Sequence, residues 1–214
     1  MRDTIDIPTI RTESRDGVFI IQLFNFSAVA EAKVQEALRE FIDSGDRKLI
    51  FDVRGNPGGF LQSAVAISSH FLPTGKVVVR ENFGDGSEER LYRSTGRTLG
   101  ASAPEEMVVL IDGGSASASE ILAGALKEHG VATLVGTQTF GKGSVQELVD
   151  LRDDSSLKVT IARWFTPNGT SISVEGLAPD IEVEVTPEDR ENGVDPQLEA
   201  AVEFLNREKA IAED

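Results

Sequence analysis

The sequence contains no cysteine among its 214 residues. Disulfide bonds, a thiol nucleophile and a cysteine-ligated zinc site are therefore excluded. It also lacks an apolar run close to the roughly 20 residues that a membrane-spanning helix needs. Clustered positive charge is a third absence, since 21 Lys and Arg face 36 Asp and Glu, for a formal net charge of −15. Because phosphate contacts need clustered Lys and Arg, no nucleic-acid partner is expected.

The composition is sufficient for one domain with a full hydrophobic core. Hydrophobic residues make up 40% of the chain, which at this length supports a single core with a small appendage. The first ten residues are mixed and charged and do not resemble a signal peptide. We therefore expect either a cytoplasmic protein or a mature or excised fragment.

Strand and helix patterns alternate along most of the chain. Apolar, β-branched runs predict strands at 18–24, 49–53, 108–111 and 133–135, and helical periodicity predicts helices at 28–44, at 60–72 and around 121–126. This alternation indicates an α/β layered domain with a largely parallel sheet. Further strands are expected as a hairpin at 77–93, as a pair at 145–151 and 157–165 joined by the Asp153–Asp154 turn, and at 179–185.

The ends of the chain are predicted to lie outside this core. Residues 1–16, with Ile5, Ile7 and Ile10, indicate an N-terminal arm or entry strand. The core then covers 17–185, and 186–214 form a linker at 186–194 followed by a helix at 197–208 that Asp195 caps.

Three serines follow the strand at 108–111 and a turn of two glycines. They stand at a predicted helix start, where unpaired N–H groups and the helix dipole favour negative charge. Ser117 and Glu120 have the spacing of a capping box, so Ser117 is either a helix cap or a nucleophile beside an oxyanion site. Spacing alone does not decide between these roles, and it does not exclude Ser115 or Ser119 as the nucleophile.

A second glycine-rich loop covers residues 136–143 and matches a phosphate-binding P-loop up to its last position. There Gly143 replaces the Ser or Thr that binds Mg²⁺, and the residues that follow have a strand pattern where a P-loop opens a helix. The nucleotide-binding interpretation is therefore disfavoured.

Lys142 in this loop is either a solvated charge or a general base. An unperturbed lysine has a pKa of about 10.4, and desolvation lowers the pKa of a catalytic lysine toward about 7–8. The sequence predicts that the apolar Phe140 helps to keep water away from the amine. Ser–Lys pairs are a known variant of nucleophilic catalysis. His70 and His129 are interpreted as structural, and no Gly-x-Ser-x-Gly elbow is present.

Four blocks of the sequence, in order, resemble the C-terminal processing proteases, the tail-specific serine peptidases of bacteria and of chloroplast lumens. The blocks are DVRGNPGGFL at 52–61, SASASEI at 115–121, TFGKGSVQ at 139–146 and GLAPDI at 176–181. The similarity runs from about residue 17 to residue 185, which is nearly the whole chain.

The resemblance implies a role for each motif. Ser117 corresponds to the nucleophile and Lys142 to the general base, and Gln146 would hold the amine in place. The oxyanion hole would consist of the backbone N–H groups of Ala118 and Gly59. The implied fold is the layered Clp- and crotonase-like core, with a mixed, largely parallel sheet flanked by helices, and no metal or cofactor is required.

Members of this family typically carry a PDZ domain before the core, and residues 1–16 cannot form one. We therefore expect an excised catalytic core or a variant that recognises substrates in another way. Protein or peptide substrates are the implied partners, with a homo-oligomer or a separate regulatory protein left open. The resemblance implies an extracytoplasmic location, in the periplasm or cell envelope. The alternative function is a latent or catalytically silent peptide-binding module of the same fold.

Overall fold

The computed structural model describes residues 8–151, 155–173 and 175–207. Three sequence-based expectations therefore lie outside the described residues. They are the arm positions Ile5 and Ile7, the Asp153–Asp154 turn, and the final residue of the helix predicted at 197–208.

A six-stranded main sheet forms the centre of the molecule. Its strands are β1 (Ile10–Arg15), β2 (Val18–Leu23), β3 (Lys48–Asp52), β6 (Glu106–Ile111), β7 (Thr133–Gly136) and β10 (Ile181–Glu182). They are ordered β1-β2-β3-β6-β7-β10, and only β1 runs antiparallel to its neighbour. The inner strands are apolar on both faces because both faces are covered, as is usual for parallel strands. The predicted mixed, largely parallel sheet is confirmed.

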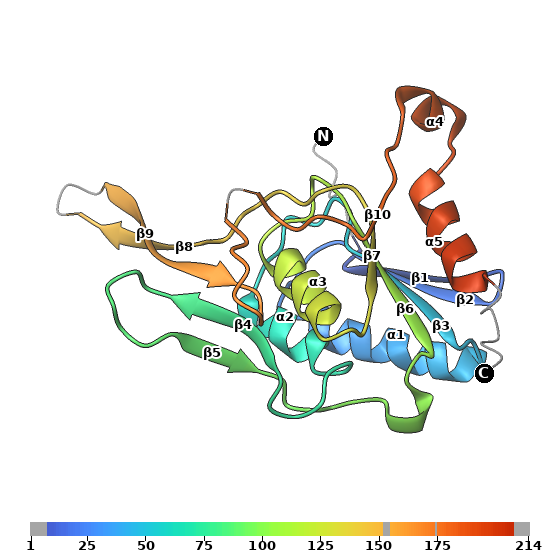
Figure 1. Ribbon diagram of the computed structural model, residues 1–214, viewed down its shortest axis with the longest axis horizontal. Helices are drawn as coiled ribbons and strands as arrows, with labels where there is room; N and C mark the ends of the chain where they lie inside the picture. Colours follow the sequence, from blue (N-terminus) through green and yellow to red (C-terminus); the bar gives the residue numbers. More distant parts are fainter. Residues whose placement is uncertain (1–7, 152–154, 174, 208–214) are drawn as a thin grey trace, which may run out of the picture.

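Helices cover the two faces of this sheet unequally (Figure 1). They are α1 (Ala30–Ser44), α2 (Leu61–Ser68), α3 (Ala118–Glu128) and α5 (Pro196–Asn206). The first three share one buried cluster with one face of the sheet, and α5 covers the other face. Gly45 ends α1 with a φ of 78°, as predicted. The helix predicted at 60–72 is shorter than expected and ends at Ser68.

A second, antiparallel sheet extends away from the main sheet (Figure 1). Its strands are β4 (Val77–Asn82), β5 (Arg90–Arg93), β8 (Ser144–Asp150) and β9 (Ser156–Phe165), in the order β5-β4-β9-β8. The two predicted strand pairs are both present, and β4 joins them by pairing with β9. This long-range pairing has no signal in the local sequence.

Two short helices lie in segments where the sequence predicts connections. The η1 turn (Gly100–Ser102) precedes β6, and α4 (Pro187–Asn192) lies inside the stretch predicted as a linker. Thr186 caps α4 by accepting a hydrogen bond from the Asp189 N–H, with a proline in the first turn. The boundaries proposed for the arm, core and linker remain a prediction.

Candidate active site

The turn between β6 and α3 holds Ser117 in an unusual backbone conformation. Its φ is 58° and its ψ is −111°, and among the described non-glycine residues only Asp16 also has a positive φ. Such a conformation costs on the order of 1–3 kcal/mol and persists only where the surroundings enforce it. Ser117 is therefore a strained position that the surrounding structure holds in place.

The three serines of this turn differ in environment. Ser115 and Ser119 are fully buried, and their hydroxyls donate to the backbone carbonyls of Val53 at 2.8 Å and Asn56 at 2.9 Å. Ser117 between them is partly exposed. Of the three serines, Ser117 is therefore the most accessible to an incoming substrate.

Glu120, in the first turn of α3, joins the two loops that the sequence singles out. Its carboxylate is fully buried. One oxygen accepts hydrogen bonds from the Ser117 N–H at 2.6 Å and the Lys142 N–H at 3.0 Å. The other accepts from the Thr139 hydroxyl and the Gly141 N–H, both at 2.7 Å. The predicted capping box is present, and the same carboxylate brings the backbones of Ser117 and Lys142 to one point.

The glycine turn after β3 packs directly against the turn between β6 and α3, which carries Ser117. A Cβ added to Gly58 would lie 2.8 Å from Ser117 Cβ and 2.9 Å from the Ala118 nitrogen, and the φ of Gly58 is 100°. Its N–H donates to the Asn56 side chain at 2.9 Å. The next residue, Gly59, is exposed, and none of the hydrogen bonds among the described residues uses its N–H. The two residues that the sequence predicts as the oxyanion hole, Ala118 and Gly59, thus lie on facing turns.

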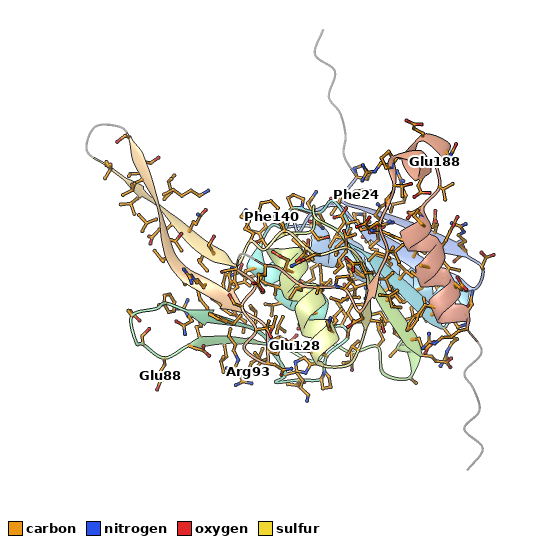
Figure 2. The ribbon with its side chains drawn as sticks, turned by 45° about the horizontal axis from the view of Figure 1, so that its top comes forward. Phe24, Glu88, Arg93, Glu128, Phe140 and Glu188 are labelled. Carbon is orange, nitrogen blue, oxygen red and sulfur yellow. The ribbon has the colours of Figure 1, made fainter. Side chains whose placement is uncertain are left out.

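Lys142 lies in the loop just before β8, and its side chain is exposed. The expectation that Phe140 shields it is wrong, because 64% of the Phe140 side chain is itself exposed. The backbone explains the difference, since the Phe140 N–H donates to the Ser115 carbonyl while the ring is directed outward (Figure 2). Lys142 and Phe140 are therefore both exposed residues.

Gln146 lies on β8, close in sequence to Lys142. The pairing of β8 with β9 shifts register between Val145 and Gln146, where Gln146 is opposite Thr160. Such a bulge changes the direction of a side chain and is common beside active sites. The side chain of Gln146 is exposed at this edge of the sheet.

The alternative sites lose support in the structure. A strand, β8, follows the 136–143 loop where a P-loop requires a helix. His129 ends α3 with Nε2 2.7 Å from the Val77 carbonyl. Burial lowers the pKa of His70, partly opposed by a hydrogen bond with the Arg97 backbone. In the part of the chain described, no group of three or more His, Asp or Glu side chains could hold a metal ion.

Comparison with protein families decides the classification. The model of Peptidase family S41 matches residues 17–183. The chain belongs to peptidase family S41. The match includes Ser117, Lys142, Gln146 and both predicted oxyanion residues, and it confirms the resemblance to C-terminal processing proteases.

Curated relatives of this S41 chain are processing proteases. The carboxyl-terminal-processing protease of Synechocystis is 39% identical over 205 residues, covering 94% of this chain and 47% of the relative. The carboxy-terminal processing protease CtpA of Bacillus subtilis is 35% identical over 185 residues, covering 86% and 39%. A probable CtpA-like serine protease of Staphylococcus epidermidis is 33% identical over 182 residues, covering 85% and 37%. The chain thus spans about half, or less, of the length of these relatives.

Solved structures share the fold. The photosystem II D1 C-terminal processing protease superposes with a TM-score of 0.76 at 29% identity, covering 97% of this chain and 55% of that one. Tricorn protease gives a TM-score of 0.63 at 23% identity, covering 88% of this chain and 17% of that one, a likeness of fold alone. No helix among the described residues is long and apolar enough to cross a membrane.

The sequence missed what Glu120 does beyond capping. Its position in the capping box gave the contact with Ser117, but the three contacts with residues 139–142 depend on how the loop before β8 folds back onto α3. Neither the periodicity nor the spacing of residues in the sequence predicts that this loop contacts α3.

Proposed function

We propose that this chain is the proteolytic core of a serine endopeptidase that cleaves protein substrates with a Ser117–Lys142 dyad. The observation that supports the dyad most strongly is the Glu120 carboxylate, one oxygen of which binds the backbone N–H groups of both residues. The strained, partly exposed Ser117 between two buried serines supports its role as the nucleophile.

In this mechanism the hydroxyl oxygen of Ser117 attacks the scissile carbonyl as the neutral amine of Lys142 takes its proton. Lys142 then delivers that proton to the leaving amine, and water hydrolyses the acyl-enzyme by the same route. The N–H groups of Ala118 and Gly59 stabilise the oxyanion, and Gln146 orients the amine. Loss of one oxyanion donor costs roughly 3–4 kcal/mol of barrier. The reaction needs no cofactor.

The exposure of Lys142 sets a condition for this chemistry. A base at neutral pH needs its amine desolvated, and Lys142 is an exposed residue. A bound substrate, or a further segment of a longer protein, must therefore cover the lysine before it acts. The same exposure favours one alternative, a peptide-binding module that is latent until it is covered.

Cleavage of an unfolded protein substrate tests the proposal. Ser117→Ala and Lys142→Ala should each lower the rate by at least about 10³-fold, since the dyad acts as a unit. Gln146→Ala should lower it less, because Gln146 orients and does not transfer protons. Lys158→Ala, which removes an exposed lysine from β9, is the matched control and should cleave normally.

Two outcomes would overturn the proposal in different ways. Full activity of either dyad variant would mean that the assignment of residues is wrong. No cleavage by the wild-type chain, together with equal peptide binding by the wild type and Ser117→Ala, would establish the latent module instead. From the family resemblance, we expect the protein to act outside the cytoplasm.

A further inference from the structure

Arg54, at the start of the glycine turn, connects that turn to the far side of the main sheet. Its side chain is only 16% exposed, and its guanidinium donates to both oxygens of Asp52, at 3.0 and 2.8 Å. It also donates to both oxygens of Asp195, at 2.7 and 2.8 Å, and to the Gln197 side chain at 3.1 Å. Asp195 and Gln197 belong to the start of α5, more than 140 positions away in sequence.

The interaction between Arg54 and Asp195 is a charge-assisted ion pair with two hydrogen bonds, which is stronger than a neutral hydrogen bond. It is a two-point guanidinium–carboxylate pair, which fixes orientation as well as distance. Burial lowers the pKa of Arg54, but its hydrogen bonds with the two carboxylates outweigh that effect and raise it. Asp195 also caps α5, accepting a hydrogen bond from the Leu198 N–H at 3.0 Å. One carboxylate therefore holds both the helix start and the arginine.

The residues after Arg54 are hydrogen-bonded to the turn between β6 and α3, which carries the predicted nucleophile. The Gly55 N–H donates to Asp112 at 2.8 Å, and Asp112 also accepts from the Gly114 N–H at 2.9 Å. The Asn56 carbonyl accepts from the Ala116 N–H at 3.0 Å. Displacement of Arg54 would therefore shift the backbone that carries the predicted oxyanion donor against the backbone that carries the nucleophile.

We propose that Asp195 is a positioning residue for the glycine turn, which carries the predicted oxyanion donor Gly59. Efficient catalysis then requires α5 to be docked against the main sheet. This inference rests on the proposed peptidase function. Asp195 acts through Arg54 and does not touch the reacting atoms. It lies beyond residues 17–183, which the family model matches, at the start of α5, which covers the opposite face of the main sheet from α3 (Figure 1).

The test separates capping, docking and positioning by the choice of variants. Asp195→Asn keeps the helix cap, because Asn and Asp cap equally well, but it removes the charge that Arg54 binds in two-point geometry. Asn206→Ala is the matched control, since it cuts the bond between α5 and Lys48 Nζ at the other end of the helix. Both variants weaken a polar contact between α5 and the main sheet. Only Asp195→Asn changes a contact with the residue at the start of the glycine turn.

Two readouts are measured on both variants. In peptide cleavage, Asp195→Asn should lower kcat about tenfold with KM within twofold, as misaligned donors act on the transition state. Hydrogen exchange of the Gly55 and Gly58 amides should be faster in the same variant. Asn206→Ala should match the wild type in both. Equal kcat in Asp195→Asn and the wild type, an equal loss in Asn206→Ala, or unchanged exchange would overturn the proposal.

The two readouts also keep the proposals distinguishable. If the wild-type chain cleaves nothing, the peptidase proposal fails, and hydrogen exchange alone decides whether Asp195 holds the turn. If the wild type cleaves and Asp195→Asn cleaves equally well, the peptidase proposal stands and the positioning role is wrong.

Discussion

Glu120 combines two tasks that the sequence describes as one. As the third residue of α3 it closes a capping box, and as a buried carboxylate it holds the loop of Lys142 against that helix. Each hydrogen bond to a charged group contributes roughly 1.5–3 kcal/mol to stability. The same residue therefore stabilises the fold and sets the separation of the predicted dyad.

Replacing this carboxylate by an amide tests that double role. Glu120→Gln turns one acceptor oxygen into a donor that faces either two N–H groups or the Thr139 hydroxyl and the Gly141 N–H. We therefore expect a loss of about 2–4 kcal/mol of unfolding free energy. Cleavage should fall about 100-fold at a temperature where the variant is still folded. Denaturant unfolding and cleavage rates measure the two effects.

Glu128→Gln is the matched control at the other end of α3. Its carboxylate accepts hydrogen bonds from the Thr166 hydroxyl at 2.5 Å and the Asn168 N–H at 2.6 Å, away from the serine turn. It should lose stability and keep its activity per folded molecule. If both variants lost activity in proportion to stability alone, Glu120 would have no special role in alignment.

The glycine turn offers a second residue-scale prediction. Gly58→Ala would bring a Cβ to 2.8 Å from Ser117 Cβ, so we expect the turns to separate and cleavage to fall at least about 100-fold. Gly55→Ala has a similar positive φ of 64° but nothing within 4 Å of its added Cβ. It should cost about 1 kcal/mol of stability from backbone strain alone. Equal activity of the two variants would contradict the close packing of the turns.

At the residue scale, the sequence predicts which residues form the motifs but not which tertiary contacts surround them. Ser117 and Lys142 are predicted as the dyad from the family resemblance of their motifs, since spacing alone leaves Ser117 as either a cap or a nucleophile. The exposure of Phe140 and the fourfold bonding of Glu120 depend on tertiary contacts across the loop before β8. A side chain's hydrophobicity alone does not fix its direction, and this is why the predicted shield around the lysine fails.

At the scale of elements, the parallel sheet was the most predictable part. Its buried strands are short apolar runs, and Gly45 marks the end of α1. The pairing of β4 with β9 was not predictable, because β5, η1, β6, α3, β7 and β8 lie between those strands in the chain. The docking of α5 through Asp195 and Arg54 was missed for the same reason.

The pH dependence of stability should report the docking of α5. Burial raises the pKa of Asp195, but hydrogen bonds and charge from Arg54 outweigh it and hold the pKa below its usual range. A depressed folded-state pKa gives stability that is present above the unfolded-state value and lost as pH falls through the folded one. The stability gap between wild type and Asp195→Asn should be constant from about pH 5 to 8 and close below about pH 4. A gap that opened toward acid pH would contradict this pair.

At the scale of the whole molecule, the net charge of −15 creates a negative field around the protein. Such a field raises the encounter rate with cationic chains and lowers it with anionic ones. We expect kcat/KM for a lysine-rich unfolded peptide to fall several-fold as ionic strength rises from about 10 to 150 mM, since the screening length shrinks from about 30 to 8 Å. The same peptide with glutamate for lysine should show the opposite trend. Equal salt dependence of the two peptides would contradict electrostatic steering.

The central claim is that Ser117 becomes acylated with Lys142 as its base. An ester substrate with a slow second step, quenched in acid during turnover, should leave an acyl group whose site mass spectrometry identifies. The predicted result is acylation of Ser117 in the wild type and of no serine in Lys142→Ala. Acylation of Ser115 or Ser119, or of Ser117 at the wild-type rate in Lys142→Ala, would contradict the account.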